Sequence, residues 1–194
     1  MYQKSAPIAN QLDASTNAVI YVAFGEFYVR QAIVSLASIF LLYRRKVPSF
    51  RIVVFTNLPN YFDWLLPLLP LVIRLVTPED IKIMSGPIDF LLRAKIAALQ
   101  LTQHEMQGHV LLIDTDTLVR QRLEKLFRGM ESGACYLHKR EWPLHVGRKH
   151  HPELCPENLN VTLASRTQIQ ISGNTLMWNS GVVGIPRANN PLLV

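Results

Sequence analysis

Two aspartates two residues apart, Asp114 and Asp116, form the motif in this sequence that is best suited to bind a metal ion. They follow the stretch HVLLI at 109–113, whose last four residues form an unbroken apolar run typical of a buried strand. Carboxylates at the end of a strand commonly hold the Mg²⁺ or Mn²⁺ that grips a diphosphate, because both ions prefer oxygen ligands. Two aspartates at a strand end can also simply cap a turn. The preceding strand favours the metal site over the turn.

Apolar runs and helical periodicities alternate in the sequence before these aspartates. The apolar runs predict strands buried on both faces over 18–24, 51–56, 71–76 and 109–113. Apolar residues spaced by three and four predict helices over 27–45 and 90–104, and we expect a short segment around 61–66. The alternation predicts an α/β fold with a mostly parallel, helix-covered sheet, which binds ligands at the carboxyl ends of its strands. We therefore expect residues 23–28 and 114–117 to form the walls of one site.

The segment 134–160 differs from the rest, because it is rich in histidine, proline and arginine and only weakly periodic. We expect the start of a strand and then a long loop here, followed by strands over 173–178 and 182–185. The histidines are expected to form a solvated basic loop, with a lid over the site as the alternative. These are His138, His145, His150 and His151. Together with Cys135 and Cys155 they match no recognised zinc spacing.

Composition and charge limit the classes of protein to which this chain can belong. Of the 194 residues 49% are hydrophobic and 18% are charged, which excludes a disordered or collagen-like chain. The 20 lysines and arginines exceed the 14 acidic residues by six, so the formal net charge is +6. A charge of this density suits a small phosphorylated ligand but not nucleic acid. The basic loop after Lys139 is available for an acidic acceptor or for peripheral contact with a membrane surface.

The length suits one domain, which we expect over 18–194 after a polar N-terminal tail at 1–17. The tail lacks the apolar stretch of a signal peptide, so we expect a cytoplasmic protein. The most apolar runs, 32–43 and 64–76, are shorter than the roughly 18 residues that span a bilayer. We therefore expect no transmembrane helix.

Four separated segments of the chain resemble those of GT-A glycosyltransferases and occur in the same order. They are AVIYVAFGEFYVRQAIVSLASI at 18–39, RAKIAALQLTQ at 93–103, DTDT at 114–117 and MWNSGVVGIP at 177–186. The similarity is greatest to the family 8 enzymes, the glycogenin and lipopolysaccharide galactosyltransferase type. It implies a Rossmann-like GT-A sheet and the transfer of a sugar, with retention, from a nucleoside diphosphate sugar. UDP-sugar is the expected donor, and the acceptor could be carbohydrate, lipid or protein.

The resemblance also implies roles for individual residues. Asp114 and Asp116 would hold Mn²⁺, or Mg²⁺, against the donor diphosphate, and Thr115 would line the donor site beside them. The backbone of Ala23 and Phe24 would meet the nucleotide base.

The remaining implied contacts lie on the two predicted helices and near the end of the chain. Tyr28 would stack on the base, and Lys95, assisted by Arg93, would approach the donor phosphate and sugar. Lys95 and the two aspartates would form the catalytic set. Asn179, Ser180 and Gly181 match the family's Asn-Ala/Ser-Gly turn, which lines the donor sugar.

Several of these residues also have ordinary structural interpretations. Lys95 and Arg93 could be solvated cations on a helix, Tyr28 could pack against its own helix, and Gly181 could serve only a turn. Glu26, at the end of the first strand, is a further candidate for contact with the base or ribose.

Parts of the family pattern have no counterpart in this sequence. The downstream histidine, a third metal ligand in family 8, is not found before Val194, and no acidic residue follows Glu157. We therefore expect a C-terminally short nucleotide-binding part. Two other functions stay open: a non-catalytic module that binds nucleotide sugars, and a haloacid dehalogenase-type phosphatase that uses Asp114 and Asp116.

Overall fold

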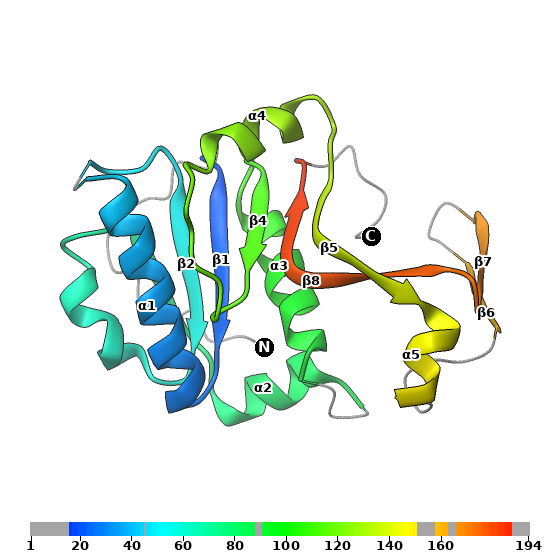
Figure 1. Cartoon of the computed structure of the whole chain (residues 1–194). Coiled ribbons are helices and arrows are strands. Elements are labelled where there is room, and N and C mark those ends of the chain that lie inside the picture. Colours follow the sequence, from blue (N-terminus) through cyan, green and yellow to red (C-terminus); the bar gives the residue numbers. More distant parts are fainter. Residues whose placement is uncertain (1–15, 45, 88–90, 151–157, 163–165, 188–194) are drawn as a thin grey trace.

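The computed structural model describes residues 16–44, 46–87, 91–150, 158–162 and 166–187. These residues form a mixed α/β structure around one large sheet (Figure 1). In chain order the elements are β1 (Ala18–Ala23), α1 (Glu26–Leu42), β2 (Arg51–Thr56), the 3₁₀ helix η1 (Pro59–Leu65), β3 (Leu71–Leu75), α2 (Pro78–Ser85), α3 (Arg93–Glu105), β4 (Val110–Ile113), α4 (Glu124–Glu131), β5 (Tyr136–Pro143), α5 (Leu144–His150), β6 (Asn158–Thr162), β7 (Gln168–Ser172) and β8 (Leu176–Ile185).

The large sheet has the strand order β3-β2-β1-β4-β8-β5. The four strands β1 to β4 run parallel to one another, and β8 pairs antiparallel with both β4 and β5. The expected α/β fold with a mostly parallel sheet is therefore confirmed. As in other parallel sheets, the carboxyl ends of β1 and β4 meet at one edge.

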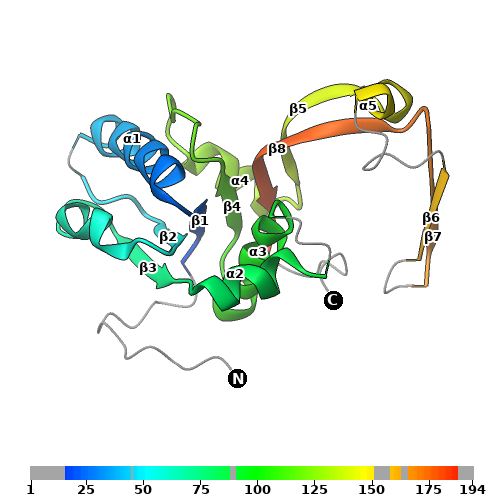
Figure 2. The same cartoon turned by 90° about the horizontal axis from the view of Figure 1, so that it is seen from below.

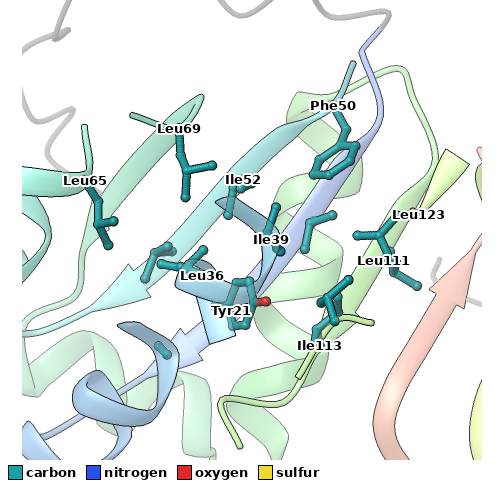
Figure 3. Close-up of a cluster of buried hydrophobic side chains, with 14 of the residues drawn as sticks. Tyr21, Leu36, Ile39, Phe50, Ile52, Leu65, Leu69, Leu111, Ile113 and Leu123 are labelled. Atoms are coloured by element: carbon teal, nitrogen blue, oxygen red, sulfur yellow. The ribbon is translucent and has the colours of Figure 1, made fainter. Parts of the chain in front are cut away.

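Helices cover both faces of this sheet. Figure 2 shows α1 on one face and α2 and α3 on the other. Successive residues of β1 alternate between these layers: Val19 and Tyr21 pack toward α1, and Ala18 and Ile20 pack toward α3. The strand side chains are buried in both layers, which explains why the strand sequences are apolar without alternation. Figure 3 shows the α1 layer, in which Leu36 and Ile39 of the helix contact the sheet.

Strands β5 and β8 continue beyond the body of the sheet as a two-stranded ribbon (Figures 1 and 2). The ribbon leads to α5 and to the antiparallel pair of β6 and β7. No helix in the described part of the chain is long and apolar enough to cross a membrane.

The structure corrects the expected elements in the second half of the chain. The long loop expected within 134–160 is wrong, because β5, α5 and β6 occupy much of this segment. The two strands expected over 173–178 and 182–185 are one strand, β8, and Gly173 lies in the turn before it. The weak periodicity has a physical cause: most side chains of β5 are exposed, so neither face of the ribbon has the apolar pattern of a buried strand.

Candidate functional site

A cavity of about 250 Å³ opens at the edge of the sheet where β1 and β4 end. Its walls come from the end of β1, the first turns of α1, the start of α3 and the turn after β4. The lining residues are Val22, Phe24, Phe27, Tyr28, Gln31, Leu91, Leu92, Lys95, Asp114, Thr115 and Asp116. The N-terminal turns of α1 and α3 both face this cavity, and the partial positive charge of a helix N-terminus favours an anionic group there.

Asp114 is the first residue after β4, and neighbouring backbone groups fix its position. Its N–H donates to the carbonyl of Gly181 in β8 at 2.8 Å, and its carbonyl accepts from the N–H of Thr117 at 3.1 Å. Its Oδ1 lies 2.5 Å from Nζ of Lys95, with both side chains about one quarter exposed or less. This ion pair joins the carboxylate of β4 to the first turn of α3 across the cavity.

Asp116 presents the second carboxylate and differs from Asp114 in its surroundings. It is exposed, and among the described residues it makes no hydrogen bond or ion pair. Two carboxylates suit a hard divalent ion, which takes oxygen ligands and completes its shell with phosphate oxygens and water. In the described part of the chain no His, Cys, Asp or Glu joins the two aspartates in a group of three that could hold a metal.

The opposite wall of the cavity is aromatic and belongs to α1. Tyr28 is 46% exposed and meets Phe27 edge to face, with ring centroids 5.4 Å apart. The chain enters α1 through Gly25, whose φ of 82° strongly favours glycine. The N–H of Gly25 donates to Oδ1 of Asn57 at 2.8 Å, which fixes this turn against the segment after β2.

A direct hydrogen bond connects the aromatic helix to the carboxylate segment. Oγ1 of Thr115 donates to Oε1 of Gln31 at 2.9 Å, and Thr115 is buried. Gln31 was not predicted as a site residue, although it follows Tyr28 by three positions and therefore shares its face of the helix. Val22, Leu91 and Leu92 were also missed, since an apolar lining residue resembles a core residue in the sequence. Phe27 lies within the predicted wall 23–28, although no individual role was predicted for it.

The structure brings together six of the predicted site residues: Phe24, Tyr28, Lys95, Asp114, Thr115 and Asp116. Ala23 does not line the cavity, and its side chain is fully buried in the α1 layer of the core. Arg93 lies on α3 but points elsewhere: its Nη1 is 3.4 Å from the carbonyl of Ile83 in α2.

Asn179, Ser180 and Gly181 also lie outside the cavity lining. The predicted turn at these positions is wrong, because all three belong to β8. Oδ1 of Asn179 accepts from the N–H of Gly181 at 2.7 Å, and its Nδ2 donates to Oε1 of Glu141 at 3.1 Å. Among the described residues, these three contact the site through one backbone hydrogen bond, which the N–H of Asp114 donates to the carbonyl of Gly181.

The secondary candidates make contacts away from the cavity. Glu26 is exposed and pairs with Arg30 at 2.5 Å, and the hydrogen bond from Arg30 lowers the pKa of this carboxyl. Nδ1 of His138 lies 3.2 Å from Oδ1 of Asn179, and Nδ1 of His145 lies 2.8 Å from the carbonyl of Gly173. The side chain of His150, and all of His151 and Cys155, lie outside the described residues. Cys135 is a free, exposed cysteine.

Comparisons with known proteins place two glycosyltransferases among the similar solved structures. No family model matches the sequence, and no curated protein matches it. The galactosyltransferase LgtC, solved with donor and acceptor sugar analogs, has a TM-score of 0.44 and 17% identity over 87% of this chain and 57% of its own. The bifunctional glycosyltransferase WbbM, in its apo form, has a TM-score of 0.47 and 13% identity over 91% of this chain and 32% of its own. The chain therefore spans less than two thirds of either protein.

Proposed function

We propose that this chain is the nucleotide-sugar-binding part of a glycosyltransferase that moves a sugar from a nucleoside diphosphate sugar to an acceptor. The main support is the cavity at the carboxyl edge of β1 and β4. It combines an aromatic wall at Tyr28, a cation at Lys95 and the carboxylate pair Asp114 and Asp116. The order of the four sequence segments that resemble GT-A enzymes adds to this support and favours UDP-sugar as the donor.

Each chemical part of such a donor has a matching group in the cavity. The aromatic rings of Phe27 and Tyr28 suit a flat base, because stacking buries apolar area without requiring a particular hydrogen-bond pattern. Lys95 and the N-terminal turn of α3 suit the negatively charged diphosphate. The two carboxylates would otherwise repel that diphosphate, so binding requires a cation between them.

Asp114 and Asp116 are the residues that would hold Mn²⁺ or Mg²⁺, and such an ion neutralises the charge that develops on a leaving diphosphate. Lys95 contributes a second positive charge from the same wall. Its ion pair with Asp114 fixes its ammonium group beside the carboxylates before a ligand binds. This reduces the reorganisation that binding requires. Retention at the anomeric carbon is proposed from the family resemblance.

Calorimetric titration with UDP, with and without Mn²⁺, tests the donor site. A parallel titration with GDP shows whether the site prefers one base over the other. We expect UDP to bind only when Mn²⁺ is present and Asp116→Asn to weaken that binding by at least about tenfold, because loss of an outer-shell partner alone costs about 10–100-fold. Asp63→Asn is the matched control, since Asp63 is an exposed aspartate of η1 that does not line the cavity. Undiminished binding by Asp116→Asn would reject the metal assignment.

The second candidate is a binding module without transferase activity. It is favoured by the two-carboxylate donor set, which has no third acidic, histidine or cysteine partner in the described residues. Incubation with radiolabelled UDP-galactose and UDP-glucose distinguishes the two functions. Mn²⁺-dependent release or transfer of the sugar supports the enzyme, whereas tight binding of the intact donor without turnover supports the module.

A further inference from the structure

A row of polar side chains on α1 and at its C-cap binds the segment that carries the two aspartates. The row consists of Gln31, Ser35, Ser38 and Tyr43, and it is called the α1 polar row below. Gln31 bonds to the side chain of Thr115, and the other three bond to backbone groups of 117–123. Positions 31, 35 and 38 are four and three residues apart, so they share one face of the helix.

The bound segment begins with a turn at residues 115 and 116 and then continues without helix or strand to residue 122, and its first three contacts with α1 fall on every second residue. Gln31 takes the hydroxyl of Thr115, Ser35 the carbonyl of Thr117 and Ser38 the N–H of Val119. Thus side chains four and three residues apart on one face of the helix meet groups that are two residues apart in the segment. After Asp114, whose N–H still bonds the carbonyl of Gly181 in β8, the segment leaves the sheet and pairs with no strand among the described residues. The helix side chains therefore provide hydrogen bonds that a neighbouring strand would otherwise supply.

The hydroxyls of Ser35 and Ser38 each donate one hydrogen bond and accept another. Ser35 donates to the carbonyl of Thr117, so Tyr21, whose hydroxyl lies 2.8 Å from the Ser35 oxygen, must donate to it. Ser38 donates to the carbonyl of Ser35 at 2.6 Å and accepts from the N–H of Val119 at 2.9 Å. Burial raises the pKa of Tyr21, which keeps its hydroxyl protonated and able to donate.

The hydroxyl of Tyr43 completes the row just beyond the last turn of α1. It accepts from the N–H of Leu123 at 3.1 Å and donates to Oε2 of Glu124 at 2.9 Å. Burial raises the pKa of Tyr43 to about 12, so this donor also persists through the neutral range. The far end of the segment is thereby fixed at the start of α4.

The same helix carries Phe27 and Tyr28, the aromatic wall of the cavity, in its first turn. One rigid element therefore holds the proposed base-binding surface and, through its polar row, the segment with Asp114 and Asp116. We propose that the α1 polar row is a set of positioning residues that fixes the carboxylates relative to the aromatic wall, so that the site is formed before a ligand binds. The consequence for nucleotide affinity rests on the proposed function, whereas the ordering of the segment does not.

Hydrogen exchange of the full chain without ligand tests the ordering directly. In Ser38→Ala the N–H of Val119 loses its acceptor, and we expect exchange in peptides covering 114–123 to accelerate by at least about tenfold, which corresponds to about 1.4 kcal/mol of opening free energy. Ser38→Thr should restore slow exchange, because threonine in a helix can bond the same carbonyl three residues earlier.

Ser132→Ala is the matched control for this experiment. Its hydroxyl also bonds the carbonyl three residues earlier, that of Gly129, at 2.7 Å, but in the described residues it binds no second segment. Wild-type exchange rates in Ser38→Ala would overturn the inference. If Ser38→Ala does not fold, Gln31→Ala replaces it, since Gln31 is only half-buried. For that variant, hydrogen exchange is measured in peptides that cover residues 114–117.

A titration with UDP and Mn²⁺ provides the functional readout. We expect Ser38→Ala to weaken binding by about threefold to tenfold and both Ser38→Thr and Ser132→Ala to bind as the wild type does. If the wild-type chain itself does not bind UDP, the proposed function fails while the exchange result still decides the ordering. If exchange accelerates but affinity is unchanged, the row orders the segment without positioning the site, and the inference is overturned.

Discussion

The hydrogen bond between the hydroxyls of Tyr21 and Ser35 gives a quantitative prediction about stability. Both side chains are essentially completely buried, with exposures of 0% and 1%. Tyr21 comes from β1 and Ser35 from α1, so their bond crosses the core layer that Figure 3 shows and ends at the carbonyl of Thr117. We consider Tyr21→Phe, Ser35→Ala and the double variant.

The two single substitutions should differ in cost because they leave different groups without a partner. Ser35→Ala leaves the hydroxyl of Tyr21 buried without an acceptor, and an unsatisfied buried group costs about 1–3 kcal/mol. Tyr21→Phe removes one bond but leaves Ser35 donating to Thr117, so we expect about 0.5–1.5 kcal/mol. In the Ser35→Ala background, Tyr21→Phe removes a hydroxyl that has lost its partner. There we expect it to be neutral or stabilising.

Urea denaturation followed by circular dichroism measures the four free energies of unfolding. Since Tyr21→Phe is expected to cost about 0.5–1.5 kcal/mol in the wild type and nothing in the Ser35→Ala background, the coupling free energy should be about 0.5–1.5 kcal/mol, and larger if the second substitution stabilises. In thermal unfolding Ser35→Ala should lower the midpoint by about 2–4 °C per kcal/mol for a chain of this size. A coupling below about 0.3 kcal/mol would refute the reasoning, because the two hydroxyls would then contribute independently.

Three further predictions concern other parts of the molecule. Burial lowers the pKa of His109 below its ordinary value of 6.5, and its Nδ1 accepts from the N–H of Arg187 at 2.8 Å. The unfolded chain therefore binds the proton more tightly. The free energy of unfolding should therefore be constant with respect to this group above about pH 6.5 and decrease as the pH falls below it. In urea titrations, His109→Asn should make that decrease smaller. Gly108→Ala should destabilise by about 1–3 kcal/mol in the same assay, since its Cβ would overlap the backbone of Thr16. Lys95→Gln should weaken Mn²⁺-dependent UDP binding by about tenfold or more in calorimetry, as expected for loss of a charged hydrogen-bond donor, and unchanged affinity would remove Lys95 from the site.

The parallel strands could be predicted because both of their faces are buried. The runs at 18–24 and 51–56 became β1 and β2 with at most one residue of difference. By contrast, α2 was missed although its start carries a recognisable signal. Thr77 and Asp80 form a reciprocal capping box, and Pro78 occupies the first turn. The helix has only eight residues, of which two are buried, so its apolar periodicity is too weak to predict a helix.

The same geometric rules explain which site residues could be predicted. Lys95 and Arg93 are two positions apart on α3, and residues at that spacing point to different sides of a helix. Only one of them could face the cavity, and the structure places Lys95 there. Gln31 could have been found by applying the same rule to Tyr28. The partner of Asp114 in β8 could not, because it is a backbone carbonyl and depends on strand pairing rather than on a side-chain type.

That backbone contact connects residues 179–181 to the segment that carries Asp114, although they do not line the cavity. A Cβ on Gly181 would lie 2.7 Å from Oδ1 of Asn179 and 2.8 Å from Nδ1 of His138, so a side chain there would displace the amide that holds the N–H of Gly181. Displacement would in turn disturb the carbonyl that accepts from Asp114. The Asn-Ser-Gly sequence thus supports the backbone N–H of Asp114 from the β8 side, whereas the α1 polar row contacts the residues that follow, from Thr115 to Leu123. The backbone of Asp114 is restrained at its N–H by Gly181 and at its carbonyl by Thr117, and the ion pair with Lys95 adds a third restraint at its side chain.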